Sequence, residues 1–153
     1  MMQTIKLTSE QMRMMSLFQK VTKSTARDCI EDEKKDRIIF VVDVGKMGLA
    51  IGRGGANIKS LKNMIKRNIE LVEFHENPEE FLKNMLNSEL VHDVKVTLRP
   101  DGTKQAMVTV EAGKKGIVVG REGRNAEKAR LLVKRYFDIG YVMINSPSKQ
   151  LLE

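Results

Sequence analysis

Two glycine-rich, basic segments of the sequence have the composition of a phosphate-binding loop. The first covers residues 45–57 and the second covers residues 113–125, so one pattern returns after 68 positions without a gap. Each segment contains two glycines separated by two residues, with an arginine after the first: Gly52-Arg53-Gly54-Gly55 and Gly120-Arg121-Glu122-Gly123. A spacing this regular indicates two copies of one structural unit, each with its own copy of the site.

Positive charge is concentrated around these loops. Residues 45–67 contain six lysines or arginines and no acid, and residues 113–135 contain eight basic side chains against Glu122 and Glu127. Each window therefore has a net charge of +6, whereas the whole chain has +7 and its remainder is acidic. Exposed helices can be basic merely for solubility, but repetition around paired glycines favours two binding sites for a polyanion.

The expected chemistry of each loop follows from the helix predicted after it. A helix that begins after Gly55 or Gly123 directs unpaired backbone N–H groups and its positive dipole end toward the loop, where phosphate is attracted. Glycines permit unusual backbone angles and leave room for a sugar-phosphate chain, while a tight turn between helices would need them for geometry alone. The candidate binding residues are Gly52, Arg53, Gly54, Gly55, Lys59, Gly120, Arg121, Glu122, Gly123 and Arg124.

Some neighbouring residues have two interpretations. Glu122 would repel phosphate unless it points to solvent or pairs with a neighbouring arginine, and it is equally consistent with an acid favoured at a helix N-terminus. The second loop is therefore expected to bind more weakly. Ile51, Ile58 and Val119 beside the loops fit core packing best, with a floor for unstacked bases as the alternative. Further lysines on the following helices extend the positive field: Lys62, Lys66, Lys128 and Lys134.

Hydrophobic periodicity predicts the first structural unit. Thr8 with Gln11 is a helix N-cap, followed by a helix whose apolar face contains Met12, Met15, Phe18 and Val21. Strands are expected at 28–31 and 37–44, joined by a charged turn at 32–36, with residues 38–42 mostly buried. A short helix at 46–51, the glycine loop, a helix with Ile58, Leu61 and Ile65 on one face, and a strand at 69–74 complete the unit.

The second half repeats this order. Asn77 before Pro78 begins a helix with an apolar face formed by Phe81, Leu82, Met85 and Leu86. Strands are expected at 91–98 and 105–110, then helix, loop and helix over 114–137 with Ala126, Ala129, Val133 and Phe137 inward, and a strand at 139–144. We therefore predict an α+β protein with domains at 1–76 and 77–144 and a polar tail at 145–153.

Several functional classes lack support in the sequence. Cys29 is the only cysteine and is interpreted as a small buried residue, and His75 and His92 are far apart, so neither a disulfide framework nor a metal site is predicted. Lys59-Ser60 lacks the preceding glycine of a P-loop, and no nucleophile and base pattern is present, so we predict no catalysis and no cofactor. The sequence contains neither a long apolar run nor a signal pattern, which favours a cytoplasmic protein.

The repeated loops resemble those of tandem type II KH domains. The residues that carry the resemblance are Ile51-Gly52-Arg53-Gly54-Gly55 with Ile58 and Lys59, and Val119-Gly120-Arg121-Glu122-Gly123. A two-domain chain of this size is most similar to the archaeal NusA-like transcription factors. That resemblance implies two three-stranded sheets packed against helices, single-stranded RNA as ligand, and a role in transcription termination or antitermination. It also implies RNA polymerase or the elongation complex as a partner, while a ribosome-associated or RNA-processing KH protein is the alternative.

Overall fold

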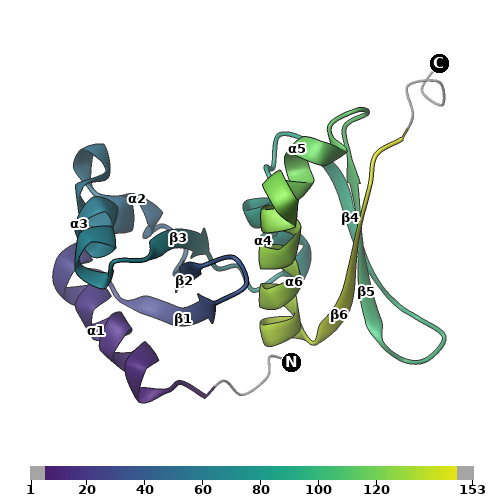
Figure 1. Ribbon diagram of the computed structural model, residues 1–153. Helices are drawn as coiled ribbons and strands as arrows, with labels where there is room; N and C mark the ends of the chain where they lie inside the picture. Colours follow the sequence, from purple (N-terminus) through teal and green to yellow (C-terminus); the bar gives the residue numbers. More distant parts are fainter. Residues whose placement is uncertain (1–5, 148–153) are drawn as a thin grey trace. The chain divides into compact units, whose positions relative to one another are not determined.

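The computed structural model describes residues 6–147, which divide into two compact units (Figure 1). One unit comprises Lys6–His75 and the other begins at Glu76. Each unit combines a three-stranded sheet with α-helices, so the predicted α+β class is confirmed.

The first unit follows the order helix, strand, strand, helix, loop, helix, strand. Its elements are α1 (Ser9–Thr22), β1 (Ala26–Asp32), β2 (Arg37–Val42), α2 (Met47–Ile51), a 3-10 turn (Arg53–Gly55), α3 (Ala56–Ile65) and β3 (Asn68–Glu73). The central strand β2 is antiparallel to β1 and parallel to β3. Because parallel neighbours need a crossover, the chain must leave the sheet between them, and that crossover is the helix, glycine loop and helix.

The second unit repeats the same order and pairing. Its elements are α4 (Pro78–Met85), β4 (Val91–Leu98), β5 (Lys104–Val110), α5 (Lys115–Val119), a 3-10 turn (Arg121–Gly123), α6 (Arg124–Phe137) and β6 (Ile139–Asn145). β5 is antiparallel to β4 and parallel to β6. β6 thus includes Asn145, which we had assigned to the tail, and residues 148–153 of that tail lie outside the described residues.

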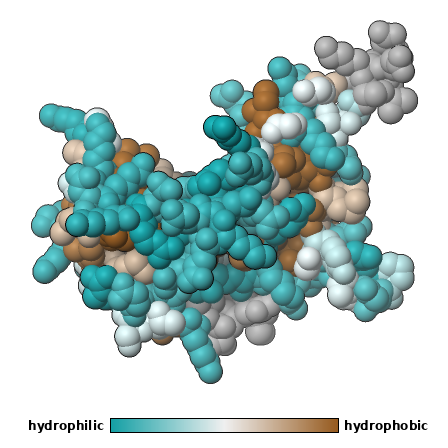
Figure 2. Space-filling view, viewed as in Figure 1, coloured by the Kyte–Doolittle hydropathy of each residue, from teal (hydrophilic) through white to brown (hydrophobic). Residues whose placement is uncertain are grey.

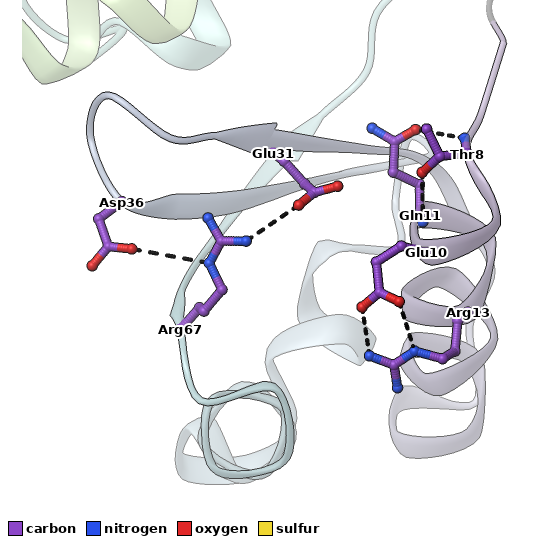
Figure 3. Close-up of polar contacts among 7 residues, drawn as sticks. All are labelled: Thr8, Glu10, Gln11, Arg13, Glu31, Asp36 and Arg67. Atoms are coloured by element: carbon purple, nitrogen blue, oxygen red, sulfur yellow. Dashed lines mark hydrogen bonds and ion pairs between the residues drawn. The ribbon is translucent and has the colours of Figure 1, made fainter.

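Helix α1 begins as predicted, and its predicted apolar face is confirmed in part: Phe18 is buried, and Met15 and Val21 pack partly buried against the core. Thr8 accepts a hydrogen bond from the Gln11 backbone, and the Gln11 side chain accepts one from the Thr8 backbone (Figure 3). The buried residues are Met14, Phe18 and Thr22, while Met12 is half exposed. The predicted stripe used steps of three residues, which drift by about 60° each around an α-helix, whereas steps of four drift less.

The core of the first unit lies between β2 and all three helices. Met14 and Phe18 of α1, Ala50 of α2 and Leu61 of α3 pack with the inward side chains of β2, and the Phe18 and Phe40 rings lie 4.7 Å apart. All six residues of β2 are buried, which confirms the prediction for residues 38–42. Cys29 is also buried, as expected.

In the second unit, α6 and α4 supply the helical side of the core. The Phe81 ring of α4 meets the rings of Tyr136 and Phe137 edge-on, at 5.8 and 6.0 Å between centroids. The predicted inward residues Ala126, Ala129 and Val133 are buried. Leu132 and Tyr136, which we had not predicted, are buried as well, whereas Phe137 is partly exposed because the helix ends there.

An ion-paired arginine is buried within the first sheet. Arg37 is 0% exposed, and its Nε lies 2.8 Å from Oδ2 of Asp32 on β1, while its Nη1 lies 3.1 Å from Oε2 of Glu70 on β3. Asp32 therefore belongs to a strand and is 7% exposed, although we had placed it in a charged turn. Arg37 connects all three strands, because it lies opposite Asp32 and next to β3 in the sheet register.

Candidate nucleic-acid interface

The two glycine loops adopt the same backbone conformation. Gly52 and Gly120 have φ, ψ of 79°, 168° and 85°, 166°, a region that is essentially restricted to glycine. Gly55 and Gly123 have φ, ψ of 77°, 16° and 76°, 16°, in the left-handed region. The repeated sequence thus folds into a repeated loop, in which the chain leaves one short helix and immediately begins another.

Asn57 explains why the first glycine of its loop cannot be replaced. A Cβ atom on Gly52 would lie 2.7–2.9 Å from atoms of Asn57, and one on Gly120 would lie 2.9–3.1 Å from atoms of Asn125. The Asn57 side chain also donates a hydrogen bond of 2.9 Å to the Leu49 carbonyl, which ties α3 to α2 across the loop. We had not assigned a role to these asparagines, although both recur in the repeat.

The third loop position distinguishes the two copies. Gly54 has φ 63° and ψ 20°, and Glu122 has φ 55° and ψ 25°, so both lie in the left-handed region. A Cβ at Gly54 would meet no atom within 4 Å, which shows that a side chain fits there sterically. The cost of a side chain at this position is instead conformational, because an ordinary residue in the left-handed region is about 1–2 kcal/mol less stable. The second loop carries that cost in addition to a negative charge.

Glu122→Gly is expected to raise the free energy of unfolding by about 1 kcal/mol, because relief of the left-handed strain exceeds the entropy lost by glycine. Urea denaturation would measure the change. Glu122→Gln is the control, since it removes the charge and leaves the backbone restriction. Equal stability of the glycine and glutamine variants would contradict a conformational origin.

Most cations predicted near the first loop are exposed and not paired with acids. Within residues 6–147, Arg53, Lys59, Lys62 and Lys66 form no salt bridge, and all four are exposed. Arg67 differs, because its guanidinium lies 3.3 Å from Glu31 and 3.9 Å from Asp36 on the β1–β2 hairpin (Figure 3). The positive charge we counted at Arg67 is therefore partly offset.

The helix after the second loop has more of its charge compensated. Arg130 lies 2.8 Å from Glu127, and Lys134 lies 3.2 Å from Asp138. The structural repeat is also shorter than the sequence repeat, because α3 and α6 differ in length. Lys66 is the left-handed C-cap of the 10-residue α3, whereas its sequence counterpart Lys134 lies inside the 14-residue α6. The two loops are therefore equivalent in backbone but not in surrounding charge.

The aliphatic residues beside the loops are less buried than expected. Ile51 is 37% exposed, and Val119 is partly exposed, so our preferred interpretation of Ile51 as a core residue is wrong. In α2 and α5 the buried positions are Ala50 and Val118, one residue earlier. Ile58 packs against the margin of the core. A helix of five residues has only one narrow inward face, and the flanking side chain is left at the surface beside the loop.

Helices α3 and α6 differ from α1 and α4 at their N-termini. Thr8 caps α1 and Asn77 caps α4 with side-chain hydrogen bonds, the latter to the backbone of Glu79 and Glu80. The glycines that precede α3 and α6 provide no side-chain cap. At these two helices the backbone of the loop acts instead: the Ala56 N–H donates to the Arg53 carbonyl and the Arg124 N–H to the Arg121 carbonyl.

The described residues provide no sign of a metal site or a membrane span. Among residues 6–147, no group of three histidine, cysteine or acidic side chains is arranged to hold a metal ion. In the same part of the chain, no helix has the length and apolar character needed to cross a bilayer.

Comparison with known proteins identifies the two units. The sequence model of the family described as "KH domain" matches residues 12–76 and again residues 76–145, each with one glycine loop. The chain belongs to the KH domain family. The resemblance seen in the loops is confirmed, and the units are named KH1, from Lys6 to His75, and KH2, from Glu76 onward.

Relatives from archaea align with most of the chain. A protein of Halobacterium salinarum named "Probable transcription termination protein NusA" is 36% identical over 92% of this chain and 99% of its own length. A protein of the same name from Halococcus morrhuae is 33% identical over 88% of this chain and 94% of its length. A solved structure, "Crystal structure of APE1850", is 37% identical, with a TM-score of 0.83 over 91% of this chain and 100% of that one.

Proposed function

We propose that this protein binds single-stranded RNA through its two glycine loops and acts in transcription termination or antitermination. The observation that supports this most strongly is that the two helices after the loops lack side-chain caps, whereas α1 and α4 have them. A phosphate at the loop would take the place of a side-chain cap at these helix N-termini and interact favourably with the helix dipole. The role in transcription is inferred from relatives whose name includes transcription termination.

In this mechanism the loops hold the backbone of the RNA. Gly52, Gly54 and Gly55 leave space for the sugar-phosphate chain, and Arg53 donates to the phosphates, with Lys59 one helical turn further along. In KH2 the corresponding residues are Gly120, Arg121, Glu122, Gly123 and Arg124. The exposed Ile51 and the partly exposed Val119 form an apolar floor beside the loops, on which unpaired bases rest.

KH1 is the stronger RNA site in this proposal. Its loop contains no acid, and four cations in and after the loop lack salt bridges within residues 6–147. KH2 has Glu122 in the loop and two of its helix cations in ion pairs. Two linked sites on one strand would still gain effective concentration over either site alone.

Acidic substitutions in the first loop test the proposal. Arg53→Asp with Gly54→Asp is expected to weaken binding of single-stranded RNA at least about tenfold, because a charge-assisted hydrogen bond contributes roughly 1.5–3 kcal/mol. The slope of log K against log salt should fall by about 0.7 for each lost phosphate contact. Fluorescence anisotropy across a salt series measures both quantities.

Lys34→Asp supplies the control, because Lys34 is an exposed turn residue and its replacement makes the same charge change as Arg53→Asp. Arg121→Asp tests the second loop and is expected to have a smaller effect than the change in KH1. If the loop variant retained wild-type affinity and salt slope while RNA bound, the loop assignment would be rejected.

The proposed partner in the cell is RNA polymerase or its elongation complex, which implies a cytoplasmic location. Purified protein added to a transcription reaction from an archaeal source should alter the fraction of terminated transcripts. Co-sedimentation with ribosomal subunits, without any effect on termination, would instead support a ribosome-associated or RNA-processing role.

A further inference from the structure

One face of the KH2 sheet is exposed. In KH2, α4, α5 and α6 all lie on one face of the sheet (Figure 1). The side chains on the other face are exposed or half exposed. KH2 therefore has an open sheet surface.

The strand register defines the open face of the KH2 sheet. Lys95 lies opposite Met107, which lies opposite Met143, and in the next row Thr97, Gln105 and Tyr141 are aligned. These side chains point away from the core, because the alternate residues of the strands, including Ala106, Val108 and Val142, are buried. Tyr141 and Met143 are 45% and 47% exposed, more than core side chains of their size normally are. In Figure 2, brown and pale residues lie among hydrophilic ones on the part of the surface formed by KH2.

An arginine lies on the exposed tyrosine. The Arg99 guanidinium carbon is 3.9 Å from the centre of the Tyr141 ring. The turn between β4 and β5 fixes the backbone of Arg99, because the Arg99 N–H donates a hydrogen bond of 2.7 Å to the Thr103 carbonyl. Asp101, in the same turn, accepts hydrogen bonds from the backbone and hydroxyl of Thr103, which lower the pKa of Asp101. The Arg99–Tyr141 pair is thus positioned before any ligand arrives.

The cations of this face, Lys95 and Arg99, form no direct salt bridge among residues 6–147, although Arg99 interacts electrostatically with Asp101 in the turn. Asp93 is the acid that lies on the same face of β4. Lys95 and Arg99 are four residues apart on one strand side, a separation of about 13 Å. The Arg99–Tyr141 pair is planar, cationic and aromatic, and Lys95 is a second cation. Together they complement a ligand that has both negative charge and flat rings.

We propose that this open face of KH2 is a further contact surface for the RNA strand. An unpaired base stacks on the Arg99–Tyr141 pair, the two methionines contact its neighbour, and Lys95 binds a phosphate. The polar residues between the apolar ones disfavour a protein partner, whose interface core would be more continuously apolar. This inference depends on the proposed RNA-binding function and extends it from the loops to the sheet.

The test measures the affinity of the full chain for random-sequence single-stranded RNA of about 20 nucleotides, longer than the site of a single small domain. Arg99→Ala with Tyr141→Ala is expected to weaken binding about tenfold, the size of effect that loss of one stacked base produces. Tyr141→Phe should bind like the wild type, since the ring remains. Leu98→Ala is the matched control, because Leu98 is 70% exposed and points to the opposite side of the same strand.

A second measurement addresses charge. Lys95→Gln should lower the salt slope by about 0.7, the change expected for one lost phosphate contact on a single strand. Photocrosslinked RNA should also be found on the peptide that contains Tyr141. Circular dichroism melts of each variant confirm that the sheet is intact before affinities are compared.

The outcomes separate the two proposals. If the wild-type protein binds no single-stranded RNA, both are wrong. If loop variants lose RNA while the sheet variants keep wild-type affinity, salt slope and crosslinks, the loops bind RNA and the sheet surface does not. Loss of affinity in the sheet variants with an intact fold, and wild-type binding by Leu98→Ala, would support the sheet as an RNA surface.

Discussion

Gly52→Ala is expected to lower the free energy of unfolding by about 2–3 kcal/mol and to weaken RNA binding at least about tenfold. Gly52 occupies a conformation that is essentially restricted to glycine, and an added Cβ would lie 2.7 Å from the side chain of Asn57. The loop must therefore open, which moves Arg53 and breaks the contact between α2 and α3. Chemical denaturation and RNA titration of the same preparation would measure both effects.

Gly48→Ala is the appropriate control for this change. Gly48 lies in α2, has no positive φ, and its added Cβ would meet no atom within 4 Å. Alanine should raise stability there by up to about 1 kcal/mol, because it is the better helix former. Should both alanine variants behave alike, steric restriction at the loop would not be the reason for glycine at position 52.

Arg37→Met is expected to lower the free energy of unfolding by about 3–5 kcal/mol, the usual cost of removing one partner from a buried ion pair. Arg37 is 0% exposed and bonds Asp32 and Glu70 from the two neighbouring strands. Without it, the largely buried Asp32 carboxylate loses its counter-ion. Urea denaturation near neutral pH would measure the loss.

Arg13→Gln serves as the comparison, because it breaks an ion pair in which both side chains are largely exposed. Arg13 lies 2.6 Å from Glu10 one turn earlier in α1 (Figure 3). Exposed pairs of this type contribute little, so the expected loss in the free energy of unfolding is much smaller than that of Arg37→Met. A small loss in Arg37→Met, similar to that in Arg13→Gln, would indicate that the Asp32 carboxylate finds water or another donor.

Local signals in the sequence predicted the elements of each unit well. Thr8 with Gln11 and Asn77 with Pro78 act at short range, so they indicate helix starts whatever surrounds them. The alternation of strand residues and the repeat of two loops led to the correct fold class. The strand order, with β2 and β5 central, follows from the crossover that the helix, loop and helix provide.

Features that depend on side chains brought together by folding were predicted less well. Asp32 resembled a turn residue because its pairing with Arg37, which Glu70 of β3 also contacts, forms only when the strands join. Ile51 resembled a core residue because hydrophobicity alone does not show that Ala50 occupies the inward position of a five-residue helix. Asn57 had no assigned role because its partner, the Leu49 carbonyl, lies across the loop.

The repeated segment in the sequence was enough to predict two similar units and the positions of their loops. The residue types in that segment also showed that the loops combine glycine with positive charge. Those features are local, since backbone freedom and charge belong to single residues and short segments. Only the folded structure shows which cations are paired: Arg67 lies beside Glu31, whereas Arg53 forms no salt bridge among the described residues. It also shows which face of the KH2 sheet is exposed. Salt bridges and burial depend on side chains brought together from separate strands and helices, and that proximity exists only in the folded chain.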